Sequence, residues 1–178
     1  MRGYLLFYCV FFICSCKSQN KSLNIDIAAK KNLQEQVSQM THAIVSNDYE
    51  MLVKFTYPAL VEKAGGPEKS LEQIKKDIED LKNKGITFDS ISFGQPTIFV
   101  NAGEEIHTLI PETLFLNVPR GTLMSESYLI AITKDKGLTW YFIDTAEIDS
   151  NNVKKTLPHY NLDLKIPPQK DPVLIKEN

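Results

Sequence analysis

The chain has 178 residues, of which 43% are apolar and 24% are charged, and its formal net charge is −2. This size and composition fit one ordinary globular domain with enough apolar residues for a core. A mildly acidic chain without a basic block lacks the electrostatic footprint of a nucleic-acid-binding protein. We therefore expect no nucleic acid among its partners.

The beginning of the chain has the pattern of a secretory leader. Arg2 precedes a run of about ten mostly apolar residues, 4–13, followed by small and polar residues. The run is shorter than the ~20 residues that a bilayer-spanning helix needs, which disfavours a permanent transmembrane helix. We interpret residues 1–15 as a signal peptide and residues 16–25 as a polar tether.

The leader ends in the quartet Ile13-Cys14-Ser15-Cys16, which resembles a bacterial lipobox. The resemblance implies that Cys16 becomes the first residue of the mature chain and carries acyl chains such as palmitate. Stable anchoring takes more than one such chain. No cysteine follows Cys16 in the sequence, so lipid attachment explains this residue better than a disulfide does.

Two alternatives to lipidation remain open: cleavage by an ordinary signal peptidase, and retention of the leader as an uncleaved anchor. Under the lipobox interpretation the protein is a membrane-anchored lipoprotein of the bacterial cell envelope. We expect it on the periplasmic side of the outer membrane, held by acyl chains on Cys16.

Residues 25–84 have helical periodicity. The first helix is predicted from apolar residues at helical spacing, namely Leu33, Val37, Met40 and Ile44. Asp48 is a capping residue for a second, shorter helix. A third helix is expected to begin at Ser70, in a capping-box pattern, and to end at Gly85.

From Ile86 onward the pattern becomes that of strands. Four are expected, at 86–100, 104–118, 122–134 and 138–147. Gly94-Gln95-Pro96 interrupts the first and Pro111 the second, which predicts bulges or edge positions there. Residues 150–178 are expected to form an extended, proline-rich tail laid on the body, with a short helix or turn near 153–157.

Helices followed by antiparallel strands predict an α+β fold, with three N-terminal helices packed on a curved sheet of about four strands. This element order, together with the late strand at 137–144, resembles the nuclear transport factor 2-like (cystatin-like) cone fold over roughly residues 26–147. We take 26–149 as that domain. The resemblance implies a pocket between sheet and helices in many members and dimers formed through the sheet.

The last predicted strand is apolar on both faces. Trp140 and Phe142 share one face, and Tyr141 and Ile143 share the other. A sheet that is apolar on both faces needs a second cover, so we expect either the tail or a partner subunit there. A homodimer through the sheet is therefore one option.

Two carboxylates fall in apolar rows of predicted strands, Asp144 in the last and Glu112 in the second. Burial raises the pKa of such a carboxyl group, so both are weak candidates for a general base. Each also has an interpretation without a catalytic role. Asp144 lies near a strand end, where a carboxylate commonly reaches solvent or accepts backbone hydrogen bonds. Glu112 follows Pro111, so its side chain can fall on the other face of the strand.

Other polar residues complete the candidate set. Tyr57, Tyr128 and His107 are candidate hydrogen-bond donors, although His107 is expected to be exposed beside the acidic 104–105 turn. The residues that we expect to line a pocket are Tyr57, Tyr128, Trp140 and Phe142. The three histidines are scattered, so no metal site is expected, and the absence of nucleotide-binding motifs predicts no cofactor.

The leading hypothesis is a lipid-anchored, non-enzymatic envelope protein that binds a small apolar ligand or another envelope protein. The alternative is an isomerase, dehydratase or hydrolase with Asp144 or Glu112 as general base and a tyrosine as electrophile. That alternative requires the carboxylate and the tyrosine to meet in one cavity. A scaffold subunit, with a filled core and an exposed apolar patch, is a third hypothesis.

Overall fold

The protein is described here by a computed structural model covering residues 22–146, 148–149 and 151–177. The leader and the lipobox-like quartet lie outside the described residues. Within the described part, no helix combines the length and the apolar character that crossing a bilayer requires.

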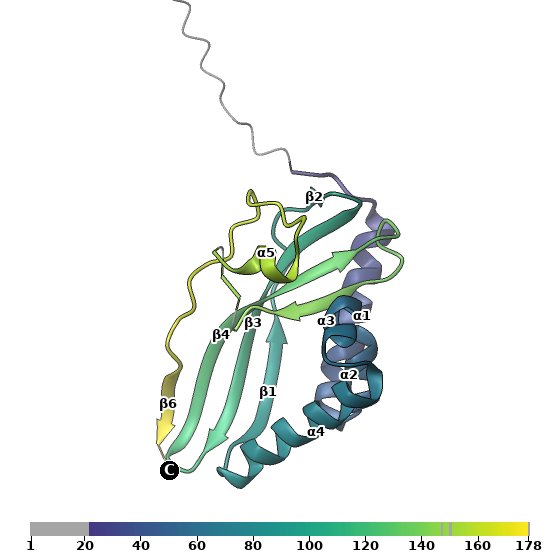
Figure 1. Cartoon of the computed structure of the whole chain (residues 1–178). Coiled ribbons are helices and arrows are strands. Elements are labelled where there is room, and N and C mark those ends of the chain that lie inside the picture. Colours follow the sequence, from purple (N-terminus) through teal and green to yellow (C-terminus); the bar gives the residue numbers. More distant parts are fainter. Residues whose placement is uncertain (1–21, 147, 150, 178) are drawn as a thin grey trace, which may run out of the picture.

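Helices occupy the first half of the described chain (Figure 1). They are α1 (Ile27–Ser46), α2 (Tyr49–Phe55), α3 (Pro58–Lys63) and α4 (Pro67–Asn83). Asp48 caps α2 as predicted, accepting a hydrogen bond from the backbone N–H of Met51 at 3.0 Å. The expectation of three helices is wrong because Pro58 begins a further helix, α3, between the predicted second and third helices. Proline suits the first turn of a helix, and Pro67 likewise begins α4 ahead of the predicted Ser70.

Six strands form one open antiparallel sheet within the described residues. They are β1 (Thr87–Phe93), β2 (Val100–Ala102), β3 (Glu105–Val118), β4 (Gly121–Thr133), β5 (Tyr141–Asp144) and β6 (Val173–Glu177). The strand order is β1-β3-β4-β5, with β2 beside β3 and β6 beside β4. The predicted number of about four is therefore corrected to six: residues 94–99 separate β1 from β2, and the tail supplies β6.

Pro111 lies inside β3 without a bulge, since the register between β3 and β4 continues unbroken through its pairing with Tyr128. The backbone N–H and C=O of Tyr128 both bond to Thr145, away from β3. The nitrogen of Pro111 therefore faces the opposite side, where β1 ends at Phe93 and no ladder donor is needed.

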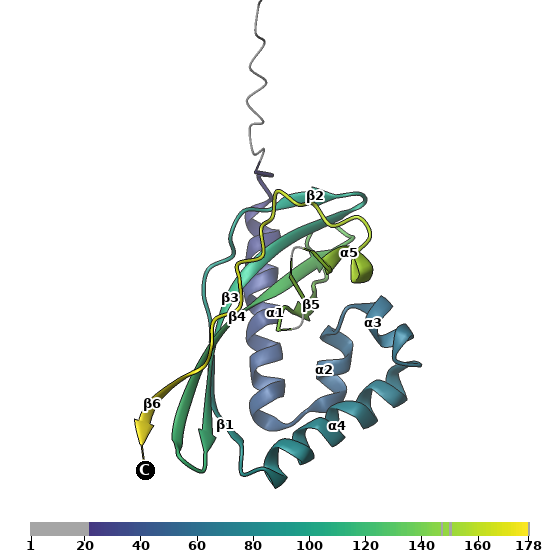
Figure 2. The same cartoon turned by 60° about the vertical axis from the view of Figure 1, so that its left-hand side comes forward.

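Two buried clusters lie on opposite faces of the sheet. The helices α1 and α2 cover one face, and the segment around α5 (Val153–Thr156) lies on the other (Figures 1 and 2). On one face α1 and α2 pack Leu33 and Phe55 against Trp140 and Phe142 of the sheet. On the other face the segment around α5 packs against the sheet through Val153, Leu157, Tyr160, Leu164 and Ile166. The tail therefore covers the second face of β5, the strand that the sequence predicts to be apolar on both faces.

Candidate functional site

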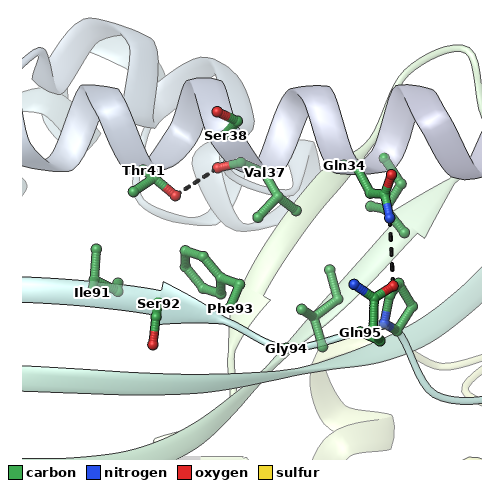
Figure 3. A pocket seen from close by; sticks show the side chains of 12 residues that line it. Gln34, Val37, Ser38, Thr41, Ile91, Ser92, Phe93, Gly94 and Gln95 are labelled. Atoms are coloured by element: carbon green, nitrogen blue, oxygen red, sulfur yellow. Dashed lines mark hydrogen bonds between the residues drawn. The ribbon is translucent and has the colours of Figure 1, made fainter.

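A groove of about 360 Å³ lies between α1 and the chain that leaves β1 (Figure 3). We call it the α1 groove. Its lining residues are Leu33, Gln34, Val37, Ser38, Thr41, Ile91, Ser92, Phe93, Gly94, Gln95, Pro96 and Ile110. None of these side chains carries a charge, and apolar groups alternate with amides and hydroxyls.

The wall opposite α1 forms because the chain leaves the sheet after β1 and returns to it three residues later. The backbone N–H of Gly94 bonds to Pro111 O at 2.8 Å, and that of Thr97 bonds to Leu109 O at 2.8 Å. Gln95 and Pro96 stand out between these two attachments. A Cβ atom at Gly94 would lie 3.2 Å from the Pro111 ring, so the close approach of the two segments favours glycine here.

The polar side chains of the α1 groove are uncharged amides and hydroxyls. Gln34 Nε2 donates to Gln95 Oε1 across the opening at 3.4 Å, and Thr41 Oγ1 donates back to Val37 O at 2.8 Å. Small-molecule sites are concave and combine apolar side chains with placed polar groups, and the α1 groove holds both kinds in similar proportion. Its volume falls in the usual range for such sites, about 300–1,000 Å³.

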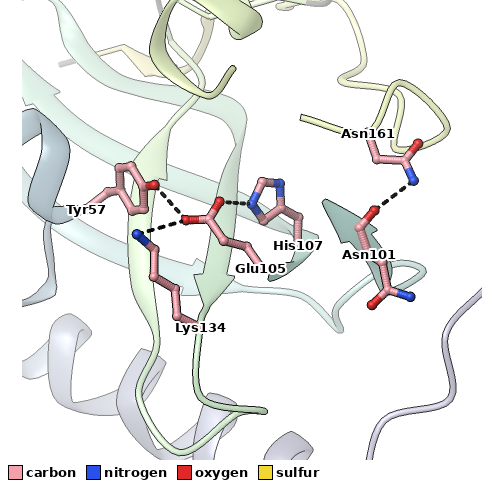
Figure 4. A network of polar contacts seen from close by, with 6 residues as sticks. All are labelled: Tyr57, Asn101, Glu105, His107, Lys134 and Asn161. Atoms are coloured by element: carbon pink, nitrogen blue, oxygen red, sulfur yellow. Dashed lines mark hydrogen bonds and ion pairs between the residues drawn. The ribbon is translucent and has the colours of Figure 1, made fainter. Parts of the chain in front are cut away.

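A second polar feature, the Glu105 cluster, lies at the face of the sheet covered by the tail (Figure 4). Tyr57 donates its hydroxyl hydrogen to Glu105 Oε1 at 2.7 Å, and Lys134 Nζ lies 3.3 Å from the same oxygen. His107 Nε2 lies 2.8 Å from Glu105 Oε2. Burial by itself would raise the pKa of Glu105, but the hydrogen bonds from Tyr57, His107 and Lys134 outweigh it and hold the pKa below its ordinary value.

The expectation that His107 is exposed is wrong, because its side chain is fully buried. The turn before β3 ends at Glu104, so His107 falls inside the strand opposite Ile132 and its ring lies 5.8 Å from that of Tyr160. Burial lowers the pKa of His107 despite the neighbouring carboxylate. Its Nδ1 has no hydrogen-bond partner among the described residues, so we infer a neutral ring that donates from Nε2 to Glu105.

The Glu105 cluster joins three parts of the chain without opening into a cavity. Tyr57 comes from the α2–α3 junction, Glu105 and His107 from β3, and Lys134 from the end of β4. None of the four lines the α1 groove or the other principal cavities of the described residues. The arrangement therefore secures the helices to the sheet, and burial together with the hydrogen bond to Glu105 raises the pKa of Tyr57.

The two nominated carboxylates lie on the helix-facing side of the sheet but differ in burial. Asp144 is exposed and accepts a hydrogen bond from Ala146 N–H at 2.8 Å. Glu112 is 9% exposed and accepts a hydrogen bond from Ser127 Oγ at 2.7 Å. Burial raises the pKa of Glu112, and the negative charge of Asp144 acts in the same direction.

Of the nominated aromatic residues, only Tyr128 lines a cavity together with one of these carboxylates, Glu112, among the described residues. Tyr128 pairs with Pro111, and therefore points to the face opposite Glu112. Both Tyr128 and Glu112 nevertheless line a small cavity of about 70 Å³ next to prolines of the tail. Tyr57 belongs to the Glu105 cluster, and Trp140 and Phe142 are buried under the helices. None of these four residues lines the α1 groove.

The residues that do line the α1 groove carry no sequence signal that singles them out. Gln34, Ser38 and Thr41 flank the apolar stripe of α1 and look like ordinary surface positions of an amphipathic helix. Within the described residues, no group of three histidine, cysteine or acidic side chains could hold a metal ion. Comparison with protein-family models, curated proteins and solved structures finds no match to this chain.

Proposed function

We propose that this protein is a lipid-anchored protein of the bacterial cell envelope that binds a small, mainly apolar ligand in the α1 groove and does not catalyse a reaction. The observation that carries the proposal is the lining of that groove. It combines apolar side chains such as Val37 and Phe93 with uncharged polar groups, and it contains no acid, base or nucleophilic thiol.

The proposed anchor lies close to the proposed site in the sequence. Cys16 is separated from Ser22, the first described residue, by only a short polar segment, and the described chain begins beside the start of α1 (Figure 1). Acylation of Cys16 would then hold α1 and its groove near a membrane surface. Apolar molecules that partition into membranes would be available there.

At the finer level of fold, we propose a nuclear transport factor 2-like cone. The order of helices before sheet and the helical cover over one sheet face support this assignment. In such a fold, a ligand site beside the first long helix fits the space between helices and sheet.

The enzymatic alternative has weaker support. It requires Asp144 or Glu112 to meet a tyrosine in one cavity, and Asp144 is exposed. Glu112 and Tyr128 do line one cavity, but its volume of about 70 Å³ is below the usual range for small-molecule sites, and strand pairing points the two side chains to opposite faces. The tyrosine that does meet a carboxylate is Tyr57, and its partner Glu105 is already occupied by two further cationic or donor groups.

Ligand binding is tested by native mass spectrometry of the full-length protein extracted from membranes in mild detergent. Ser38 lines the groove, whereas its neighbour Gln39 is an exposed residue outside the lining. Ser38→Trp should remove a co-purifying ligand, because the indole fills the groove, and Gln39→Trp should keep it. Equal ligand loading of both variants would refute the groove as the site.

Anchoring is tested by intact mass and membrane fractionation of two cysteine variants. Cys16→Ser should abolish the mass of the acyl groups and the cleavage before residue 16, since serine cannot form the thioether. Cys14→Ser is the matched control and should be processed normally. Normal processing and membrane association of Cys16→Ser would refute lipid anchoring at this residue.

A further inference from the structure

A second hollow of about 430 Å³ adjoins the α1 groove at the beginning of α1. Its walls come from residues 22–24, from Lys30 and Gln34 of α1, and from residues 95–99. It shares Gln34, Gln95 and Pro96 with the α1 groove. The two hollows therefore lie end to end along α1, on either side of these three residues.

The hydrogen bond between Gln34 and Gln95 spans the boundary between the two hollows (Figure 3). It measures 3.4 Å, at the long end of the hydrogen-bond range, and joins two exposed side chains. Water can replace it at little cost when the side chains swing apart. One channel would then extend along α1 from Lys30 to Thr41, a length of roughly 17 Å at the rise of an α-helix.

The charge along this channel is confined to one end. Lys30 is the one charged side chain in the combined lining of the two hollows. Its Nζ lies 5.9 Å from the centre of the Phe99 ring, which also lines the second hollow. No carboxylate of the described residues lies within ion-pair distance of Lys30, whereas the adjacent Lys31 pairs with Glu35 at 3.5 Å.

From this arrangement we infer that the ligand is a single-chain amphiphile with a carboxylate head group. The hydrocarbon chain lies in the α1 groove beside Val37 and Phe93, and the carboxylate lies at Lys30. The inference rests on the proposed function, because it assigns a ligand class to the same groove. It follows from the shape, which suits one extended chain, and from the single cation placed at one end.

The test uses membranes that contain the full-length protein. Two photoreactive probes with the same chain of about sixteen carbons are added, a size that fits a small-molecule site. One probe is the fatty acid and the other is the corresponding fatty alcohol, which lacks the charge. Labelling is measured per protein, and the labelled peptides are identified by mass spectrometry. The fatty acid should label peptides from α1 and from 91–99.

Lys30→Gln and its neighbour Lys31→Gln form a matched pair, since both remove one exposed cation from the same helical turn. Lys30→Gln should raise the fatty-acid concentration that gives half-maximal labelling about three-fold. This is the effect expected from losing a solvent-exposed ion pair. Labelling by the alcohol should not change, and Lys31→Gln should behave like the unmodified chain with both probes.

The outcomes separate this inference from the proposed function. Equal labelling by acid and alcohol, with no effect of Lys30→Gln, overturns the carboxylate assignment but leaves ligand binding in the α1 groove intact. Failure of both probes to label the groove peptides, or labelling that Ser38→Trp does not reduce, overturns the amphiphile assignment. Loss of the co-purifying ligand in Ser38→Trp then decides separately whether the groove binds another ligand.

Discussion

Glu105 and Glu112 are buried carboxylates on the same strand, and each is 9% exposed. Their pKa values nevertheless move in opposite directions, down for Glu105 and up for Glu112. Glu105 receives hydrogen bonds from Tyr57 and His107 and an ion pair from Lys134. Glu112 receives one hydroxyl hydrogen bond and faces the like charge of Asp144.

This comparison shows that burial alone does not decide whether a carboxylate stays ionised. The free energy lost on leaving water is offset at Glu105 by three donating partners, one of which, Lys134, is positively charged. At Glu112 one neutral donor offsets only part of that loss. Ionised Glu105 therefore stabilises the contact between the helices and the sheet, whereas ionisation of Glu112 lowers the stability of the fold.

Glu105→Gln should cause the largest effect of the variants that test this comparison. We expect a loss of about 3 kcal/mol of unfolding free energy at pH 7, because the amide cannot accept from Tyr57, His107 and Lys134 together. The folded pKa of Glu105 is lowered, so its contribution is present above its ordinary value of 4.5 and is lost as pH falls through the folded value. Urea denaturation across acidic and neutral pH should show the penalty shrinking in acid. A pH-independent penalty would contradict an ionised Glu105.

Tyr57→Phe should have a smaller effect, a loss of about 1.5 kcal/mol, since it removes one hydrogen bond to a charged acceptor and keeps the ring. The same urea titration measures it. Tyr49→Phe is the control, because the Tyr49 hydroxyl donates to Asn47 at an exposed position. If both variants lost the same amount, the hydrogen bond to Glu105 would contribute nothing specific.

Glu112→Gln should act in the opposite direction and stabilise the protein by about 1 kcal/mol at neutral pH, because it removes a buried charge and keeps an acceptor for Ser127. The folded pKa of Glu112 is raised, so its favourable contribution is complete below its ordinary value of 4.5 and is lost as pH rises through the folded value. The gain from Glu112→Gln should therefore grow with pH in thermal or urea unfolding. A loss of stability at pH 7 would contradict this expectation, because it would mean that ionised Glu112 is stabilised by more than the hydrogen bond from Ser127.

Lys134→Gln should have the smallest effect, about 0.5 kcal/mol or less, because the Lys134 side chain is 59% exposed. High salt should shrink this difference further by screening. A large, salt-independent loss would mean that Lys134 holds Glu105 ionised by itself, and that Tyr57 and His107 contribute less than the geometry indicates.

The elements that the sequence predicted best are those with strong local signals. The apolar spacing of Leu33, Val37 and Met40 identified α1, and Asp48 identified the start of α2. Alternation in the last strand placed Trp140 and Phe142 on one face and Ile143 on the other, as the two buried clusters confirm. These patterns are visible because helix and strand periods act over a few neighbouring residues.

The errors arose where the outcome depends on distant partners. The sequence predicted a bulge or an edge position at Pro111. The structure has no bulge there, and the Pro111 nitrogen faces the side where β1 has ended. His107 was expected in solvent beside an acidic turn, but the tail covers that face of β3 and Tyr160 packs beside the His107 ring. The sequence predicted an interruption of the 86–100 strand at residues 94–96, but not that this part of the chain builds one wall of the α1 groove.

The sequence by itself determined the α+β class, the long first helix, the doubly apolar strand and the lipobox-like quartet, because each rests on residues close together in the chain. Only the tertiary structure decided that the tail covers the second face of the sheet and that Glu105 has three donating partners. It also decided where the uncharged α1 groove lies. Those features join residues such as Tyr57 and Glu105, or Gln34 and Gln95, across long stretches of chain. Their free energies depend on packing that no local pattern contains.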